Sequence, residues 1–231
     1  MSEQTTSTTS PRIGLIHALE ESVLPIRDAF SRLWPEAQTA DLLDTSLSAD
    51  LAQAGVLDQA MIERFLTLGR YAASGNGTQD TQAILFTCSA FGPAIEAVKS
   101  DLSIPVLRPN EAAFEEALAV GTHIALVVTF PPSLPSLTRE LEELAKTRGK
   151  TIHITPVLAE GALAALKAGD GAGHDAAVLA ACQNLGMQDV VLLGQFSLAR
   201  AAKVLQPHVD CPIITTPDST VRALRRLVAL S

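Results

Sequence analysis

Short, continuously apolar runs alternate along the chain with longer segments whose apolar residues lie three and four positions apart. The apolar runs cover residues 13–17, 39–43, 83–87, 106–107, 124–129, 152–155, 190–194 and 212–215. Continuous apolar character is typical of strands that are buried on both faces. The segments between them (22–33, 57–73, 94–102, 111–118, 134–147, 158–167, 174–185, 198–205 and 219–230) have helical spacing. Repeated alternation of this kind predicts an α/β fold with parallel sheets and right-handed crossovers.

Composition and charge indicate the fold class and exclude some classes of partner. The chain has 231 residues, of which 47% are hydrophobic and only 4% aromatic, and this suits helices packed on parallel strands. Its formal charge of −8 argues against a surface that binds nucleic acid without sequence preference. No window approaches the roughly 18 apolar residues of a membrane span. We therefore expect neither nucleic acid nor membrane among its partners.

The N-terminus and the cysteines indicate the cellular compartment in which the protein is expected. Residues 1–11 are polar and lack the features of a signal peptide, so we expect a disordered tail. Cys88, Cys182 and Cys211 have no C-x-x-C spacing, and one of them is left over from any pairing. These features predict a cytoplasmic protein without a disulfide framework or a structural zinc site.

The two halves of the sequence resemble each other. At one fixed offset Cys88 falls on Gln195, and Pro105 falls on Pro212. I-G-L-I-H-A near Ile13 likewise resembles I-A-L-V-V-T near Ile124 at almost the same offset. Either the chain contains a duplication, or these are two ordinary βαβ units that look alike.

A duplication predicts two similar lobes, related by pseudo-two-fold symmetry, with a cleft between them. The predicted first lobe comprises residues 12–108 and 208–231, and the second comprises residues 109–207. Ligands bind at the carboxyl ends of the strands in open parallel sheets, so Cys88 and Gln195 would face each other there.

Several motifs make the chain similar to the aspartate/glutamate racemase superfamily, which includes hydantoin racemases, maleate isomerases and arylmalonate decarboxylases. They are I-G-L-I-H-A-L (13–19), L-L-D-T-S-L (42–47), T-C-S-A-F-G (87–92), T-F-P-P-S-L (129–134), G-A-L-A-A-L-K-A-G-D (161–170) and D-V-V-L-L-G-Q-F-S-L-A (189–199). The resemblance covers nearly all of the chain after the tail. It implies two Rossmann-like lobes and an enzyme that needs no cofactor.

The resemblance also implies a role for Cys88. The family's racemases use one cysteine from each lobe, and the two transfer a proton on opposite faces of a substrate α-carbon. Cys88 matches the first cysteine, with Thr87 and Ser89 as flanking hydrogen-bond donors to a substrate carboxylate. A nearby helix N-terminus is expected to lower the pKa of the thiol. The alternatives are that Cys88 is a small buried residue and that the hydroxyls cap a helix.

The second cysteine of the family is missing. Gln195 stands at its position, and a carboxamide is neither an acid nor a base near neutral pH. Cys211 and Cys182 do not replace it, because one precedes a strand and the other lies in a helical pattern. A single thiol still supports one-sided proton transfer, cis–trans isomerisation through covalent addition, or decarboxylation followed by protonation.

Five further residues are candidates for the site. Gln195 and Ser197 would hold a substrate carboxylate, with Phe196 as an apolar wall and Thr129 as another donor. Alternatively, Ser197 caps its helix and Phe196 belongs to the core. His17 ends the first strand on the ligand side and is the candidate to replace the lost acid–base group. No histidine pair has the spacing of a metal site.

The sequence therefore predicts a cofactor-independent isomerase or racemase-like enzyme that acts through Cys88 at the α-carbon of a small carboxylate or amino-acid-like substrate. Two alternatives stay open: a single-cysteine decarboxylase or lyase, and a ligand-binding member of the fold without catalysis. The L-R-R-L-V-A-L segment near the C-terminus is an apolar helix suited to a homo-oligomer interface.

Overall fold

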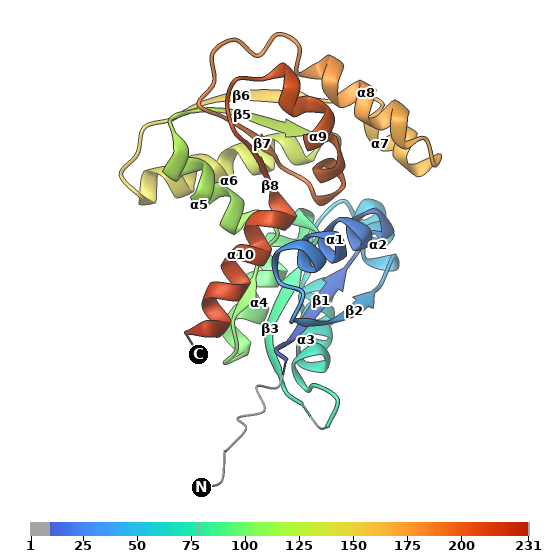
Figure 1. Ribbon diagram of the computed structural model, residues 1–231. Helices are drawn as coiled ribbons and strands as arrows, with labels where there is room; N and C mark the ends of the chain where they lie inside the picture. The colour runs from blue at the N-terminus through green and yellow to red at the C-terminus, as the bar shows by residue number, and fades with distance from the viewer. Residues whose placement is uncertain (1–9, 78, 231) are drawn as a thin grey trace, which may run out of the picture.

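The computed structural model describes residues 10–77 and 79–230, so most of the predicted N-terminal tail lies outside the described residues. It contains two four-stranded parallel sheets, with the orders β2-β1-β3-β4 and β6-β5-β7-β8. The first sheet comprises β1 (Arg12–His17), β2 (Gln38–Leu43), β3 (Thr81–Phe86) and β4 (Val106–Leu107). The second comprises β5 (His123–Val128), β6 (His153–Leu158), β7 (Val190–Leu193) and β8 (Ile213–Thr215). Figure 1 shows one sheet in each of two lobes.

Helices cover both faces of the first sheet. On one face Ile13 and Leu15 pack against α1 (Val23–Leu33) and α10 (Thr216–Ala229). On the other face Ile16 and Phe86 pack against α2 (Ser46–Ala54), α3 (Gln59–Ala73) and α4 (Gly92–Asp101). Burial on both faces explains why these strands are continuously apolar.

The second sheet is covered in the same way. Leu126 and Val128 pack against α5 (Glu111–Val120) and α6 (Ser133–Thr147). Val127 and Leu193, on the opposite face, share a core with α7 (Ala162–Lys167), α8 (Gly171–Ala181) and α9 (Ala202–Leu205).

In each lobe, the helix that follows the last strand packs against the other lobe. α5 follows β4 but packs in the core of the second lobe, whereas α10 follows β8 and packs against α1 in the first lobe. The two helices meet where they cross, and Arg222 on α10 lies 2.8 Å from Glu116 on α5. Figure 1 shows α10 leaving the upper lobe and running down the side of the lower one.

This crossover differs from the predicted domain division. The sequence-based division assigns residues 208–231 to the first lobe, but β8 pairs in parallel with β7 of the second sheet, for example Ile214 with Leu192. The chain therefore returns to the first lobe at Thr216, the first residue of α10. Strand pairing between distant segments sets this boundary, and no local sequence pattern reveals it.

The predicted fold class is confirmed: the chain is α/β, with two similar lobes built on parallel sheets. The prediction missed α2, which contributes a single buried residue, Leu47, and so has little helical apolar pattern. The segment 198–205 divides into a 3-10 helix, η3 (Phe196–Ala201), and the short α9. Within the described residues, no helix is both long and apolar enough to cross a membrane.

Equivalent backbone hydrogen bonds relate the two lobes. The N–H of Thr87 donates to the carbonyl of Ile16 over 3.0 Å, and that of Gly194 donates to Val127 over 2.9 Å. Both pairs lie at the offsets between the two halves of the sequence. The two lobes therefore share the same backbone arrangement at these strand ends.

Candidate functional site

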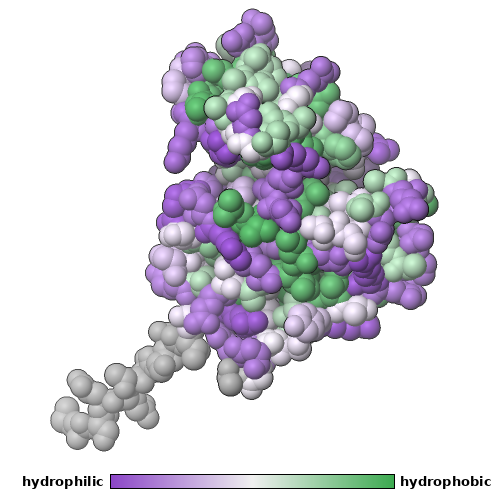
Figure 2. Space-filling view, turned by 90° about the vertical axis from the view of Figure 1, so that its right-hand side faces the viewer, coloured by the Kyte–Doolittle hydropathy of each residue, from purple (hydrophilic) through white to green (hydrophobic). Residues whose placement is uncertain are grey.

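Cys88 and Gln195 occupy matching places at the ends of matching strands. Cys88 follows β3 and precedes a 3-10 helix, η2 (Ser89–Phe91), while Gln195 follows β7 and precedes η3. η3 contacts α1 and α10 of the first lobe, and η2 contacts α6 of the second. Both segments therefore lie where the lobes meet. Figure 2 shows that the molecule narrows between the lobes.

The Cys88 thiol lies in apolar surroundings. The residue is half-buried and packs against a core cluster that contains Phe65, Phe86 and Phe91. This desolvation raises the pKa of Cys88, and a hydrogen bond from the backbone of Ala90 only partly offsets it. The expectation of a lowered pKa is wrong, because desolvation in these apolar surroundings outweighs that hydrogen bond. Cys88 therefore rests as a neutral thiol.

His17 is fully buried and bonded at both ring nitrogens. Its Nδ1 lies 2.9 Å from Oγ1 of Thr87, and its Nε2 lies 2.9 Å from Oδ1 of Asp41 on β2. The other carboxylate oxygen of Asp41 accepts bonds from Nε and Nη2 of Arg27, over 3.0 and 2.8 Å. The sequence prediction named His17 and Thr87, and the structure joins them in a chain that runs from Thr87 to Arg27.

Asp41 carries a negative charge in this chain. Partial burial raises the pKa of its carboxyl group, but the hydrogen bonds and charges of His17 and Arg27 outweigh burial and bring the pKa below its usual value. The sequence analysis missed both Asp41 and Arg27. An available signal for Asp41 was a charged residue in the strand T-A-D-L-L, whereas Arg27 gave no signal in its helix.

Gln195 and Thr129 bind each other. Oε1 of Gln195 accepts hydrogen bonds from the N–H of Thr129 over 2.7 Å and from its hydroxyl over 2.8 Å. Among the described residues, the one partner of Gln195 Nε2 is the hydroxyl of Ser133, at a long distance of 3.5 Å. The donor end of the carboxamide is therefore the end that is available for a ligand.

The remaining predicted residues differ in their surroundings. Phe196 is only 2% exposed and packs in the core of the first lobe with Ile13 and Leu15, which favours the core alternative over an apolar wall of the site. Ser89 and Ser197 are half-buried, and their hydroxyls have no hydrogen-bond partner within the described residues. No side chain caps η2, α4 or η3, so the capping alternative is wrong.

The polar chain of the first lobe has no counterpart in the second. At the offsets between the lobes, His17 corresponds to Val128 and Thr87 to Gly194. Asp41 lies opposite Leu15 in its sheet, and the matching position opposite Leu126 is Pro156. A Cβ at Gly194 would lie 3.0 Å from Leu126 Cδ1 and 3.2 Å from the Val127 carbonyl oxygen, so a side chain there would be crowded. The two lobes thus share a backbone but differ in acid–base chemistry.

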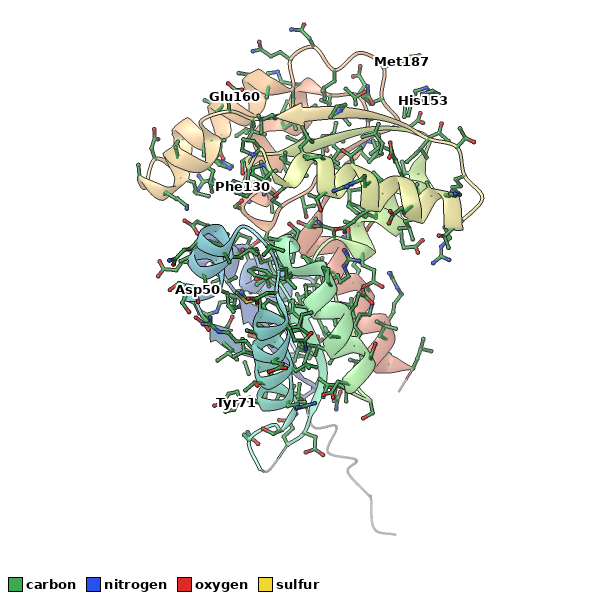
Figure 3. All side chains as sticks on the ribbon, turned by 180° about the vertical axis from the view of Figure 1, so that it is seen from behind. Asp50, Tyr71, Phe130, His153, Glu160 and Met187 are labelled. Carbon is green, nitrogen blue, oxygen red and sulfur yellow. The ribbon has the colours of Figure 1, made fainter. Side chains whose placement is uncertain are left out.

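The space directly beside Cys88 is narrow. A hollow beside Cys88 is bordered by Ile16, His17, Ala18, Leu47, Phe65 and Phe86, and it is too narrow to admit a water molecule. Phe130, which follows Thr129, is 44% exposed. Figure 3 shows it on the side of the second lobe that faces the first.

Metal binding finds no support in the part of the chain that the structure describes. Residues 10–77 and 79–230 contain no group of three or more His, Cys, Asp or Glu side chains arranged to hold an ion. The site instead offers a thiol, hydroxyls, an imidazole and a carboxamide, which can donate hydrogen bonds and transfer protons.

Comparisons with known proteins show the family and the fold of the chain. The sequence model described as Asp/Glu/Hydantoin racemase matches residues 31–224. Allantoin racemase from Pseudomonas fluorescens has a similar structure, with a TM-score of 0.69 and 16% identity over 95% of this chain and 91% of that one. Glutamate racemase RacE1 from Bacillus anthracis gives 0.69 and 15% over 96% and 83%.

A decarboxylase shares the fold as well. The Gly74Cys mutant of arylmalonate decarboxylase, in its sulfate-associated form, gives a TM-score of 0.63 and 15% identity, over 95% of this chain and 94% of that one. No curated protein sequence matches the chain. At these identities the likeness of the structures shows the fold, and the match of the sequence model shows the family.

Proposed function

The chain belongs to the Asp/Glu/hydantoin racemase family, and on that premise we propose that it is a cofactor-independent enzyme that transfers a proton at the α-carbon of a small carboxylate. Cys88 is the group that transfers the proton, and it acts on one face of the substrate. The reaction uses the α-proton transfer of the family's racemases and isomerases, but from one face only, so at a stereocentre it exchanges the proton with retention of configuration and does not invert the centre.

The observation that carries this proposal is the difference between the lobes. One lobe has Cys88 beside a Thr87–His17–Asp41 chain, whereas the other has Gln195 bonded to Thr129, with Val128 and Gly194 at the matching positions. A two-sided mechanism needs an acid or a base on both faces of the carbon. Only the first lobe supplies one.

Proton transfer at Cys88 exchanges an S–H bond for a C–H bond. In the forward direction a carbanion-like, enediolate-like centre takes the proton from Sγ, so that a C–H bond forms, the S–H bond breaks and a thiolate remains. In the reverse direction the thiolate takes the proton back from the α-carbon. The free hydroxyls of Ser89 and Ser197 and the Nε2 group of Gln195 are suited to donate hydrogen bonds to the carboxylate, on which negative charge develops.

Decarboxylation followed by protonation is the second candidate. The apolar surroundings of Cys88 favour it, because they raise the pKa of the thiol and keep the proton on sulfur at rest. Protonating the carbanion left by loss of carbon dioxide requires an acid and no initial base. The two candidates therefore share Cys88 and differ in how the carbanion arises.

Solvent deuterium uptake at the α-carbon tests the proposal. The substrates are aspartate, glutamate, a hydantoin and a substituted malonate, and the variants are Cys88→Ala and Cys211→Ala. Cys211 is half-buried and borders a separate pocket of about 340 Å³ with Met187 and Gln188, so its substitution is the matched control. We expect exchange or decarboxylation in wild type and in Cys211→Ala, with loss in Cys88→Ala. Equal rates in both variants would contradict the proposal, and no turnover of any substrate would favour a ligand-binding role.

A further inference from the structure

The His17 ring has no contact with solvent, so water cannot serve as a hydrogen-bond partner of either ring nitrogen. Its exposed fraction is 0%, and each nitrogen has one polar neighbour, Thr87 at Nδ1 and Asp41 at Nε2, both at 2.9 Å. The position of the ring proton is therefore decided by what these two neighbours donate and accept.

Asp41 can only accept at Nε2. A carboxylate has no proton to give, and Arg27 donates two hydrogen bonds to its other oxygen, Oδ2. Nε2 of His17 must consequently carry a hydrogen, which it donates to Oδ1 of Asp41. Arg27 on α1 thus determines which oxygen of Asp41 is left to face the ring.

The direction of the Thr87 hydroxyl follows from the state of Nδ1. When the ring is neutral, Nδ1 has a lone pair and the Thr87 hydroxyl donates to it. When the ring is an imidazolium, Nδ1–H donates to Thr87 Oγ1. The hydroxyl group of Thr87 keeps its proton and donates a hydrogen bond to a different acceptor. The carbonyl oxygen of Ile16, 3.4 Å from Oγ1, is one such acceptor, and a substrate carboxylate would be another.

We propose that Asp41, oriented by Arg27, is a positioning residue that fixes the Nε2–H tautomer of His17 and thereby sets the direction of the Thr87 hydroxyl next to Cys88. The functional part of this inference rests on the proposed proton transfer at Cys88, whereas the tautomer itself does not. The arrangement belongs to one lobe only, since Pro156 and Val128 stand where Asp41 and His17 have their counterparts.

The variant Asp41→Asn makes the sharpest test. Arg27 has only donors to offer, so it will keep the carboxamide oxygen of the new side chain on its own side. The amide NH₂ group then points at His17 and donates to Nε2, which must become the acceptor. The expected result is a switch of the neutral ring to the Nδ1–H tautomer.

Two-bond ¹H–¹⁵N NMR spectra of the histidine rings report this switch directly. His17→Gln assigns the signal among the five histidines of the chain. At a pH at which the ring is neutral, we expect Nε2–H in wild type and Nδ1–H in Asp41→Asn. Arg27→Gln is the control, because it leaves Asp41 as an acceptor and so keeps Nε2–H. Nδ1–H in wild type, or no change in Asp41→Asn, would overturn the inference.

Thr87→Val covers the case in which Asp41→Asn does not fold. It removes the partner at Nδ1 and leaves Asp41 in place, so the Nε2–H tautomer should persist. Its conversion to Nδ1–H would mean that Thr87, and not Asp41, sets the tautomer.

Deuterium exchange then tests the functional part. With a substrate that wild type exchanges, Asp41→Asn should slow α-carbon exchange roughly tenfold or more. In the Nδ1–H tautomer His17 donates to Thr87 Oγ1, so the Thr87 hydroxyl no longer has its wild-type direction. A switched tautomer with an unchanged exchange rate would refute the positioning role. If wild type exchanges no substrate, the proposed function fails while the tautomer result stands on its own.

Discussion

Oε1 of Gln195 accepts hydrogen bonds from both the N–H and the hydroxyl of Thr129, the residue that follows the central strand of the same sheet. Because a backbone N–H can only donate, the oxygen of the carboxamide must face Thr129 and the NH₂ group must face away. Gln195 is thus held as a fixed donor at the strand end that corresponds to the position of Cys88 in the other lobe.

Gln195→Glu should weaken binding of a carboxylate substrate. The new side chain keeps an oxygen for Thr129 but replaces the donor with a negative charge. Losing a hydrogen bond to a charged group costs about 1.5–3 kcal/mol, or roughly a ten- to hundredfold rise in Kd. Isothermal titration with the substrate that the exchange assay identifies measures this change. Gln183→Glu, at an exposed position in the same lobe, controls for the added charge, and equal affinities in the two variants would contradict the donor role.

Phe196→Ala should destabilise the protein by about 3–5 kcal/mol. Phe196 belongs to the second lobe by sequence, but it is 2% exposed within the core of the first lobe, so its loss leaves a cavity between them. Urea unfolding of the variant measures the cost. Phe130→Ala removes an aromatic ring that is 44% exposed, and it should change stability by less than about 1 kcal/mol. Similar effects of the two substitutions would mean that Phe196 is not a core residue.

Cys88 should react slowly with iodoacetamide near neutral pH. Desolvation raises the pKa of its thiol above the ordinary value of 9.0, and the thiolate is the reactive form. We therefore expect the alkylation rate to keep rising as pH increases through 9. Peptide mass spectrometry separates Cys88 from Cys182 and Cys211. A rate that reaches its plateau below pH 8 would show an activated thiolate instead.

An ion pair between the lobes predicts a pH dependence of stability. Arg108, which follows β4, pairs with Glu140 on α6. Burial raises the pKa of Glu140 above its ordinary value of 4.5, and the charge of Arg108 only partly opposes this. In the folded protein the carboxyl group therefore binds its proton more tightly than in the unfolded chain. Its contribution to stability is fully present below the ordinary pKa and is lost as pH rises through the raised value.

Glu140→Gln isolates this effect, because the variant lacks the titrating group. Wild type should lose stability relative to Glu140→Gln between pH 4.5 and the raised pKa of Glu140, with no further change at higher pH. Urea unfolding of both proteins at several pH values measures the difference in the free energy of unfolding. A difference that changes in the opposite direction would show that the Arg108 charge outweighs burial.

Local pattern predicted the strands and most helices, because burial on both faces leaves β1, β3, β5 and β7 continuously apolar. It failed for α2, whose only buried residue is Leu47. It also failed for the lobe to which β8 belongs. That assignment depends on the pairing of β8 with β7, and the sequence of residues 208–215 does not indicate this pairing.

In the site, too, single residues could be predicted from the local sequence, whereas contacts between distant residues could not. Cys88, His17 and Gln195 were recognisable as polar or thiol residues at the ends of apolar strands. The bonds of His17 to Asp41 and Thr87 were not, because they join residues 24 and 70 positions away through the registers of three strands. The same holds for the depth of Phe196, which is set by the contact between the lobes.

The most direct test of one-sided proton transfer is the stereochemical course of exchange. A single enantiomer of the substrate found in the exchange screen is incubated in D₂O, and deuterium content and enantiomeric excess are followed together by NMR and chiral chromatography. Acid–base chemistry on one face predicts deuterium uptake in wild type with the starting configuration retained, and loss of uptake in Cys88→Ala. Racemisation at the same rate as deuterium uptake would contradict the account, because it would require a second acid–base group on the face that Gln195 occupies.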